Sequence, residues 1–279
     1  MKVNRVNHYV AEVTDYNYND RAITDLFSEY KFICIRNENP VTQNQLVQLG
    51  EMFGKVYSHE WPLPLQSDAK MWVDGERKIF RISNALDKDK IELGGLGQQH
   101  AHWHCDASHM EDDFHGTILY NHYNGHLTKT IFSDQVAAYN SLTDEQKLEF
   151  EDTIGYHMIN HGPDRPLVFG SFRYSGDKRE TLPMERRMVM RQPFTKEKCL
   201  YLSPVTWAGS RTRDSNQSLT KEYIFTLANE TATNKYTHEW QQYDVCINDN
   251  IGLMHERLEW KHGIRVLYRL HFSYDKCSI

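Results

Sequence analysis

The sequence predicts a mainly β protein in which helices pack outside a β core, in a single domain of residues 1–279. Short segments rich in β-branched and aromatic residues, separated by breaks that contain glycine or asparagine, fill the middle and the end of the chain. Segments with helical spacing are fewer and flank them. A chain of 279 residues with 39% apolar residues is long enough to bury one sizeable core.

The first part of the chain predicts helix, strand, helix. Residues 20–30 form a helical stripe that Asp20 could cap, with apolar residues at i, i+3, i+4 and i+7: Ile23, Leu26, Phe27 and Tyr30. The stretch KFICIRN that follows is rich in β-formers and predicts a short strand. Residues 41–54 return to helical spacing and end at Gly54, which suits a left-handed helix stop.

The middle of the chain predicts a mainly antiparallel sheet system, built from the stretches KIFRISNAL, QQHAHWHCDASH, TILYNHYN and TKTIFSDQ. One helix interrupts it, because Thr143 with Gln146 three residues later forms a capping box. A later helix is predicted with Leu219, Tyr223 and Leu227 on one face. The closing strands are YDVCIND and GIRVLYRLHFSY.

Charge and cysteine usage narrow the class of protein. The formal net charge of −6, from 32 basic and 38 acidic residues, provides no broad cationic surface for nucleic acid. Five scattered cysteines with no CxxC pair indicate reduced thiols, and no apolar run resembles a signal peptide or a membrane span. We therefore expect a soluble cytoplasmic protein. The basic run at residues 173–191 is interleaved with acidic residues, so we expect a solvated, mobile surface segment.

The stretch QQHAHWHCDASH, residues 98–109, concentrates groups that can bind metals. In a strand, alternation would place four of them on one face: His100, His102, His104 and Asp106. Residues two apart lie about 6.6 Å from each other, so side chains at that spacing can lean together onto one ion. Either His102 with His104 or His104 with Asp106 could supply two ligands, although a His-x-Asp pair alone is weak evidence.

A third ligand has to come from a distant segment. A facial iron site uses two histidines and one carboxylate and leaves three positions open for a co-substrate and oxygen. The C-terminal region offers His255, with His262 and His271 as competitors, and Arg269 lies fourteen residues beyond His255. An arginine can pair bidentately with the far end of a dicarboxylic co-substrate, and this spacing favours His255.

Four stretches together resemble a known family. HWHCDASH is similar to the Trp-His-x-Asp pattern of the TauD/TfdA (taurine dioxygenase and clavaminate synthase-like) family of Fe(II)- and 2-oxoglutarate-dependent oxygenases. TKTIFSDQVAAYNSLTDEQK, YDVCINDNIGLMHER and RVLYRLHF resemble later segments of that family, in the same order, from about Phe80 to the C-terminus. The chain departs from the pattern at Asn248, where the family usually has Trp, and at Tyr243, where it usually has Gly.

The resemblance implies a double-stranded β-helix, or jelly roll, with Fe(II) bound by His104, Asp106 and His255. It also implies that Thr130 and Arg269 hold the distal carboxylate of 2-oxoglutarate, with Arg265 as a further candidate. Oxygen, O2, would take the remaining metal position. The expected reaction is oxidation, most simply hydroxylation, of a C–H bond in a small polar metabolite, with release of succinate and CO2.

Several alternatives stay open at this point. The same site could perform desaturation or ring formation, whereas a carboxylate at position 106 disfavours halogenation. A zinc hydrolase could use His102, His104 and His255, and a jelly roll without turnover could act as a binding protein. We expect His100 and His102 to line the substrate pocket. A small molecule is the expected partner, without nucleic acid or membrane, and a homo-oligomer is compatible with the sequence.

Overall fold

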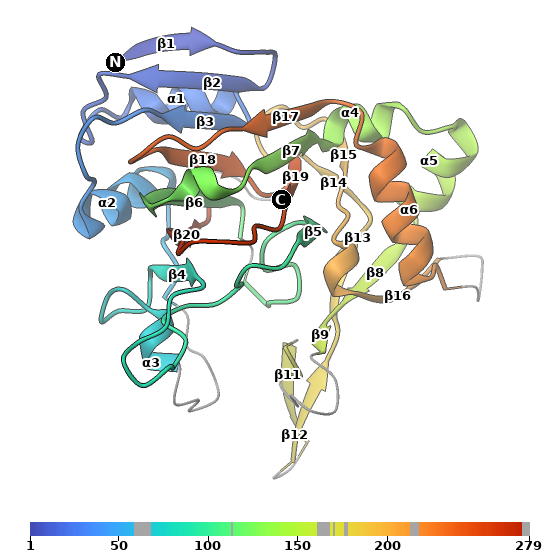
Figure 1. The fold of residues 1–279 in the computed structure, drawn as a ribbon. Helices are drawn as coiled ribbons and strands as arrows, with labels where there is room; N and C mark the ends of the chain where they lie inside the picture. The colour runs from blue at the N-terminus through green and yellow to red at the C-terminus, as the bar shows by residue number, and fades with distance from the viewer. Residues whose placement is uncertain are drawn as a thin grey trace.

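Two stacked β-sheets with helices on their outer sides form the centre of the molecule (Figure 1). The computed structural model describes residues 1–58, 68–112, 114–160, 168–169, 171–175, 178–212 and 218–274. The larger sheet has seven strands in the order β1 (Lys2–Arg5), β2 (Val10–Thr14), β3 (Phe32–Ile35), β18 (Val245–Asp249), β6 (Gly116–Tyr123), β20 (Val266–Phe272) and β4 (Phe80–Ser83). Neighbouring strands are antiparallel except for β2 and β3.

The smaller sheet is antiparallel throughout and has the order β17 (Lys235–His238), β7 (Thr130–Asp134), β19 (Leu253–Arg257) and β5 (Ala101–His104). Its inner face packs against the larger sheet through a shared apolar cluster. Phe32 of β3 and Phe132 of β7 meet there with ring centroids 4.6 Å apart, which is a favourable aromatic distance. The strands expected from residues 31–37 and from the central and closing stretches are therefore confirmed.

Helices α1 (Ala22–Glu29) and α2 (Gln43–Phe53) cover the outer face of the larger sheet. Asp20 accepts the N–H of Ala22 at 3.0 Å, although the residue at the N-cap position of α1 is Arg21. Thr42 and Gln45 form a capping box at the start of α2. The helix ends at Gly54 as predicted, but the glycine is extended rather than left-handed.

Helices α4 (Gln135–Asn140), α5 (Asp144–Glu151) and α6 (Lys221–Thr231) cover the outer side of the smaller sheet. The capping box of Thr143 and Gln146 starts α5 as predicted, whereas α4 was not predicted. The buried face of α6 contains Ile224 and Leu227, while Tyr223 is 38% exposed. The predicted face was therefore wrong at Tyr223, because the tertiary contacts select the neighbouring position.

The remaining elements form small sheets and short helices beside this sandwich. They are α3 (Asp68–Met71), η1 (Gly125–Leu127), η2 (Pro204–Thr206), β8 (Ile154–His157), β9 (Ile159–Asn160), β10 (Val168–Phe169), β11 (Ser171–Ser175), β12 (Lys178–Leu182), β13 (Met184–Arg187), β14 (Val189–Arg191), β15 (Lys198–Leu200) and β16 (Trp207–Arg211). The described parts of the basic run at 173–191 thus form strands rather than irregular chain. None of the helices in the described ranges has the length and apolar character needed to cross a bilayer.

Candidate active site

Two neighbouring strands of the smaller sheet bring the predicted metal ligands together. His104 at the end of β5 stands directly opposite His255 of β19, and their ring centroids are 4.2 Å apart. Asp106 follows two residues after His104. One ligand atom from each of these three residues lies within 4.8 Å of the other two. The structure therefore assembles two imidazoles and one carboxylate at one point.

The protonation states of the two histidines suit metal binding. Nδ1 of His104 lies 2.6 Å from the carbonyl oxygen of His102, and a proton on Nδ1 would leave the Nε2 lone pair free. That Nε2 lies 3.8 Å from Oδ1 of Asp106. Burial lowers the pKa of His104, and burial together with His104 lowers the pKa of His255 to about 3. Both side chains are therefore neutral, which is the form that binds metals.

The carboxylate of Asp106 is held in its ionised form by the larger sheet. Burial alone would raise its pKa, but Arg269 and His271 of β20, helped by His255, hold the pKa of Asp106 well below its usual range. Nη1 of Arg269 donates to Oδ1 at 2.9 Å, and Thr117 Oγ1 of β6 donates to Oδ2 at 3.2 Å. A negative ligand therefore faces the point where the imidazoles converge.

Asn250 fixes the backbone on which Asp106 stands. Its Oδ1 accepts the N–H of Asp106 at 2.8 Å, and its Nδ2 donates to the carbonyl oxygens of Asp106 at 2.8 Å and Phe114 at 2.9 Å. Asn250 itself is fully buried, directly after β18. Sequence reasoning assigned it no role, although it belongs to the Asp-Asn pair of the stretch YDVCINDNIGLMHER, which was the available signal.

The three ligands open onto a pocket between the two sheets. Four polar side chains line it beside the ligands: Thr130, Arg257, Arg265 and Arg269. Apolar residues complete the lining, among them Ile82, Leu119 and Leu267. With three guanidinium groups and the single carboxylate of Asp106, the pocket has an excess of positive charge. Such a pocket favours an anionic ligand with more than one negative charge.

Arg265 and Arg269 occupy different places in this pocket. Arg269 pairs with Asp106, whereas Arg265 is 1% exposed and lies against the rings of Trp240 and Trp260, 5.9 and 5.5 Å from their centroids. Trp240 also donates its indole N–H to Thr130 Oγ1 at 3.0 Å. Burial lowers the pKa of Arg265 to about 9, and no carboxylate of the described residues pairs with it. Arg265 therefore shares the Trp240 side of the pocket with Thr130.

Arg257 is a pocket residue that sequence reasoning missed. It lies two positions after His255 on β19, so alternation along the strand places both side chains on one face. Its guanidinium donates to the carbonyl oxygens of Leu96 at 2.9 Å and Gly97 at 2.8 Å, and also to that of Gln99. Arg257 thereby fixes the segment that leads into β5.

A β-bulge in β5 places His100 and His102 away from the metal ligand His104. Ala101 of β5 stands opposite Arg257 of β19, and His104 stands opposite His255. Three residues along β5 therefore span the same distance as two residues along β19. His100 instead lies 3.0 Å from Oε2 of Glu256, which stands between His255 and Arg257 in the sequence and so on the other face of β19. His102 is exposed and its ring packs against Phe225 of α6 at 5.6 Å.

The predicted common face was therefore wrong for His100 and His102, because the bulge changes the alternation that the prediction assumed. The alternative zinc set of His102, His104 and His255 is likewise not assembled, since Asp106 takes the third place. A role of His100 and His102 in substrate binding stays a prediction, and their position does not favour it.

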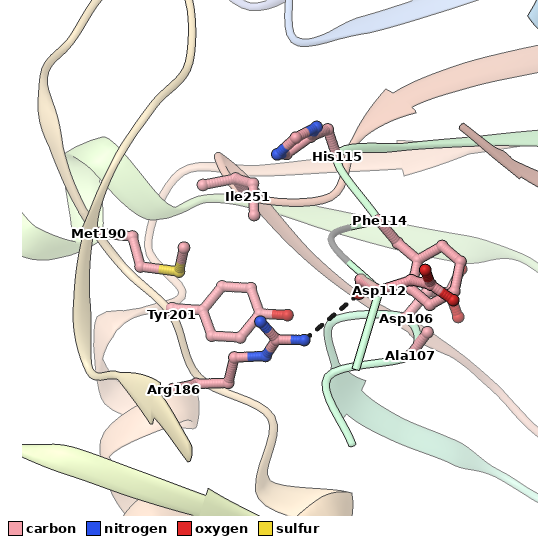
Figure 2. Close-up of a pocket in the computed structure, with 9 residues that line it drawn as sticks. All are labelled: Asp106, Ala107, Asp112, Phe114, His115, Arg186, Met190, Tyr201 and Ile251. Carbon is pink, nitrogen blue, oxygen red and sulfur yellow. Dashed lines mark hydrogen bonds between the residues drawn. The ribbon is translucent and has the colours of Figure 1, made fainter. Parts of the chain in front are cut away.

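A second pocket lies beside Asp106, and Arg186 of β13 crosses it (Figure 2). The guanidinium of Arg186 donates to the carbonyl oxygens of Ser108 at 3.2 Å, Met110 at 2.5 Å and Asp112 at 3.3 Å. Figure 2 shows Arg186 beside Tyr201 and directed toward Asp112. Arg186 thus connects the basic run to the loop after Asp106, a long-range contact with no local sequence signal.

Comparisons with known proteins identify the family and the fold of this chain. The family model described as "Taurine catabolism dioxygenase TauD, TfdA family" matches residues 9–271. The structure of AAD-2 in complex with Mn(II) and N-oxalylglycine superposes with a TM-score of 0.70 at 19% identity, covering 100% of this chain and 99% of that one. A putative alpha-ketoglutarate-dependent taurine dioxygenase from Burkholderia xenovorans gives 0.70 at 19% identity, covering 98% and 93%.

A curated relative, the alpha-ketoglutarate-dependent dioxygenase cnsP of Penicillium expansum, is 28% identical over 154 residues. That match covers 54% of this chain and 41% of the relative, so it spans less than half of the relative's length.

The solved structures share the fold of this chain, the double-stranded β-helix that the resemblance implied. The family match defines the class of protein as dioxygenases of the taurine catabolism type. The chain belongs to the TauD/TfdA family of these enzymes.

Proposed function

We propose that this protein uses Fe(II), 2-oxoglutarate and O2 to hydroxylate a C–H bond of a small polar metabolite. One oxygen atom enters the metabolite as a hydroxyl group, and the other enters succinate as 2-oxoglutarate loses CO2. The observation that carries the proposal is the convergence of His104, Asp106 and His255 beside an arginine-lined pocket. Two nitrogen donors and one carboxylate are the donor set of non-haem iron oxygenases, and they leave positions open for both co-substrates.

Each polar residue of the site has a role in this proposal. His104, Asp106 and His255 would hold the iron, which supplies the oxidising chemistry when bound together with 2-oxoglutarate and oxygen. The arginines of the pocket and Thr130 would hold the carboxylates of 2-oxoglutarate by charge-assisted hydrogen bonds. The AAD-2 structure contains N-oxalylglycine, also a dicarboxylate, together with Mn(II), which supports this reading. The apolar lining would exclude water from the reacting atoms.

The proposal can be tested by succinate release. Small polar metabolites are screened with the iron-loaded protein, and the one that stimulates succinate formation most is used with the variants. We expect Asp106→Ala to abolish iron-dependent succinate formation, because the metal loses its only anionic protein ligand. His255→Ala provides a second variant, and Asp152→Ala, at the exposed end of α5, provides a matched control with normal activity.

Circular dichroism confirms that each variant is folded before activity is compared. Unchanged succinate formation in folded Asp106→Ala and His255→Ala would rule out the proposed ligands. Mass analysis of the oxidised metabolite separates hydroxylation, which adds one oxygen atom, from desaturation or ring formation, which each remove two hydrogen atoms.

A further inference from the structure

We propose that the core between the two sheets contains a second metal site, which binds zinc(II) through Cys34, His238 and Cys246. The described residues form two groups of three or more side chains able to hold a metal, and Cys34, His238 and Cys246 form the one outside the active site. None of these residues belongs to the proposed iron site or its pocket. The inference is therefore independent of the proposed function.

The two cysteines come from neighbouring strands of the larger sheet and the histidine from the facing sheet. Cys34 of β3 stands directly opposite Cys246 of β18 in the antiparallel register. His238 lies at the end of β17, and its Nε2 is 3.3 Å from Sγ of Cys246. One ligand atom from each of the three residues lies within 4.8 Å of the other two. Three zinc-type donors thus converge without any local sequence motif.

Asp244 lies next to these ligands but is not part of the group whose ligand atoms all lie within 4.8 Å of one another. Its Oδ2 lies 3.3 Å from Nε2 of His238, and its Oδ1 is buried without a hydrogen-bond partner among the described residues. In a tetrahedral zinc site with bonds of about 2.0–2.3 Å, neighbouring ligand atoms are roughly 3.3–3.8 Å apart. The 3.3 Å distance from Nε2 of His238 to Sγ of Cys246 matches this spacing.

The charges of the site favour zinc(II) over a monovalent ion. The three ligands and the neighbouring Asp244 are fully buried, so an occupied site has to be close to neutral. Two thiolates balance one divalent cation, and Asp244 shares the positive charge of Arg36 with Glu12. A copper(I) ion would leave one negative charge unbalanced, and zinc is the divalent ion that thiolate and imidazole ligands bind most commonly in structural sites.

The surroundings of His238 also orient its imidazole ring for a role as a metal ligand. The hydroxyl of Tyr236 lies 3.4 Å from Nδ1 of His238, so Nε2 is directed toward Cys246 and Asp244. Trp240 and Phe32 pack against the imidazole ring and keep it in this orientation. Burial raises the pKa of the Cys246 thiol, so metal binding would release its proton.

The first experiment measures the zinc content of a variant that lacks the iron site. The double variant His104→Ala/Asp106→Ala is purified after growth with added zinc, dialysed, and analysed by elemental mass spectrometry. We expect about one equivalent of zinc per chain, because the core ligands are intact. Cys34→Ser, added to this background, should remove the zinc. Cys199→Ser is the matched control, since Cys199 is equally buried but lies in another apolar cluster.

The second experiment uses cobalt(II) alone as a probe of thiolate ligation. Cobalt bound to cysteine gives a thiolate-to-metal charge-transfer absorption, whereas the iron site offers only nitrogen and oxygen ligands. We expect this absorption in the wild-type protein and in the double variant, and its loss in Cys34→Ser. His238→Gln, should the cysteine variant not fold, is expected to shift and weaken the band.

The result that would overturn the proposal is a folded wild-type protein that retains no zinc beyond the iron site and shows no thiolate-to-cobalt absorption. A disulfide between Cys34 and Cys246, found by mass analysis of freshly isolated protein, would also overturn it. In either case Cys34, His238 and Cys246, with the neighbouring Asp244, form only a hydrogen-bonded core cluster.

Discussion

At the scale of single residues, Asp106 connects the chemistry of the site to both sheets. Its backbone lies in the turn just after β5 of the smaller sheet, while Arg269 and Thr117 of the larger sheet contact its carboxylate oxygens. A buried charge of this kind is tolerated only when it is paired and hydrogen-bonded. Loss of either the carboxylate or Arg269 would leave the other charge without its partner, so the two residues have to be considered together.

Arg265 and Arg269, on either side of Leu267, are expected to have different effects on 2-oxoglutarate binding and on iron retention. We predict that Arg265→Ala raises the apparent requirement for 2-oxoglutarate by about tenfold or more, because one charge-assisted hydrogen-bonding partner contributes about 1.5–3 kcal/mol. Arg269→Ala should raise this requirement too and in addition weaken iron retention, because Asp106 loses the ion pair that holds it ionised. Succinate formation as a function of 2-oxoglutarate concentration, together with bound iron, measures both effects.

Arg21→Ala, at the exposed start of α1, is the control for removing an arginine. An unchanged requirement for 2-oxoglutarate in both variants would show that the carboxylates bind elsewhere. Loss of iron from Arg265→Ala but not from Arg269→Ala would contradict the division of roles between them.

At the scale of elements, the loop after Asp106 is fixed from two directions. Asn250 binds its beginning through the backbone of Asp106, and Arg186 of β13 binds the carbonyl oxygens of Ser108, Met110 and Asp112 (Figure 2). Residues at the rim of a metal site often lie in loops. Such loops need contacts of this kind to keep a fixed geometry. The position of the Asp106 carboxylate thus depends on elements far away in the sequence.

We predict that Arg186→Ala loosens this loop without unfolding the molecule. Hydrogen exchange of the amides at residues 108–112 should become about tenfold faster, which corresponds to roughly 1.4 kcal/mol of lost local stability. Hydrogen-exchange mass spectrometry measures this directly. Arg211→Ala is the control, because Arg211 pairs with Glu185 at an exposed position on the strand that carries Arg186 and also contacts Tyr156. Equal exchange in both variants would show that Arg186 does not fix the loop.

At the scale of the whole molecule, several histidines are buried in their neutral form in both main sheets and in the small sheet that contains β8. Burial, with a contribution from nearby Arg186, lowers the pKa of His157 to about 3, and burial also lowers the pKa values of His238 and His271. In the unfolded chain a histidine has a pKa of about 6.5. Below that pH the unfolded chain therefore binds more protons than the folded protein, and stability falls as the pH falls.

We predict that the metal-free protein loses about 1 kcal/mol of unfolding free energy per buried histidine between pH 7.5 and pH 5.5. His157→Gln should reduce this loss by about that amount, since His157 is not a proposed metal ligand and its Nδ1 bonds Thr206 Oγ1 at 2.9 Å. Urea unfolding at the two pH values measures the difference. His126→Gln, at an exposed position, is the control, and an equal loss in both variants would contradict the prediction.

The sequence predicted the parts of this molecule that depend on local pattern. Helices α1, α2 and α5, the main strands and the three residues that converge at the site all follow from spacing or from motif order. The pattern could not show the bulge in β5, because one extra residue changes which face each side chain occupies without changing composition. Arg186 and the cluster of Cys34, His238 and Cys246 depend on contacts between distant segments, which no local signal reports, whereas Asn250 was marked only by the Asp-Asn pair of its motif.

The bulge in β5 also affects how freely this part of the sequence can change. On one side of it His104 belongs to the reactive centre, whereas His100 and His102 lie on the opposite face beside Glu256 and Phe225. Because His104 shares no face with His100 and His102, we expect substitutions of His100 or His102 to have little effect on the position of His104. The outer face of this segment can therefore be changed while the metal ligand on its inner face is retained. Positions 100 and 102 offer a place for attaching probes near the site.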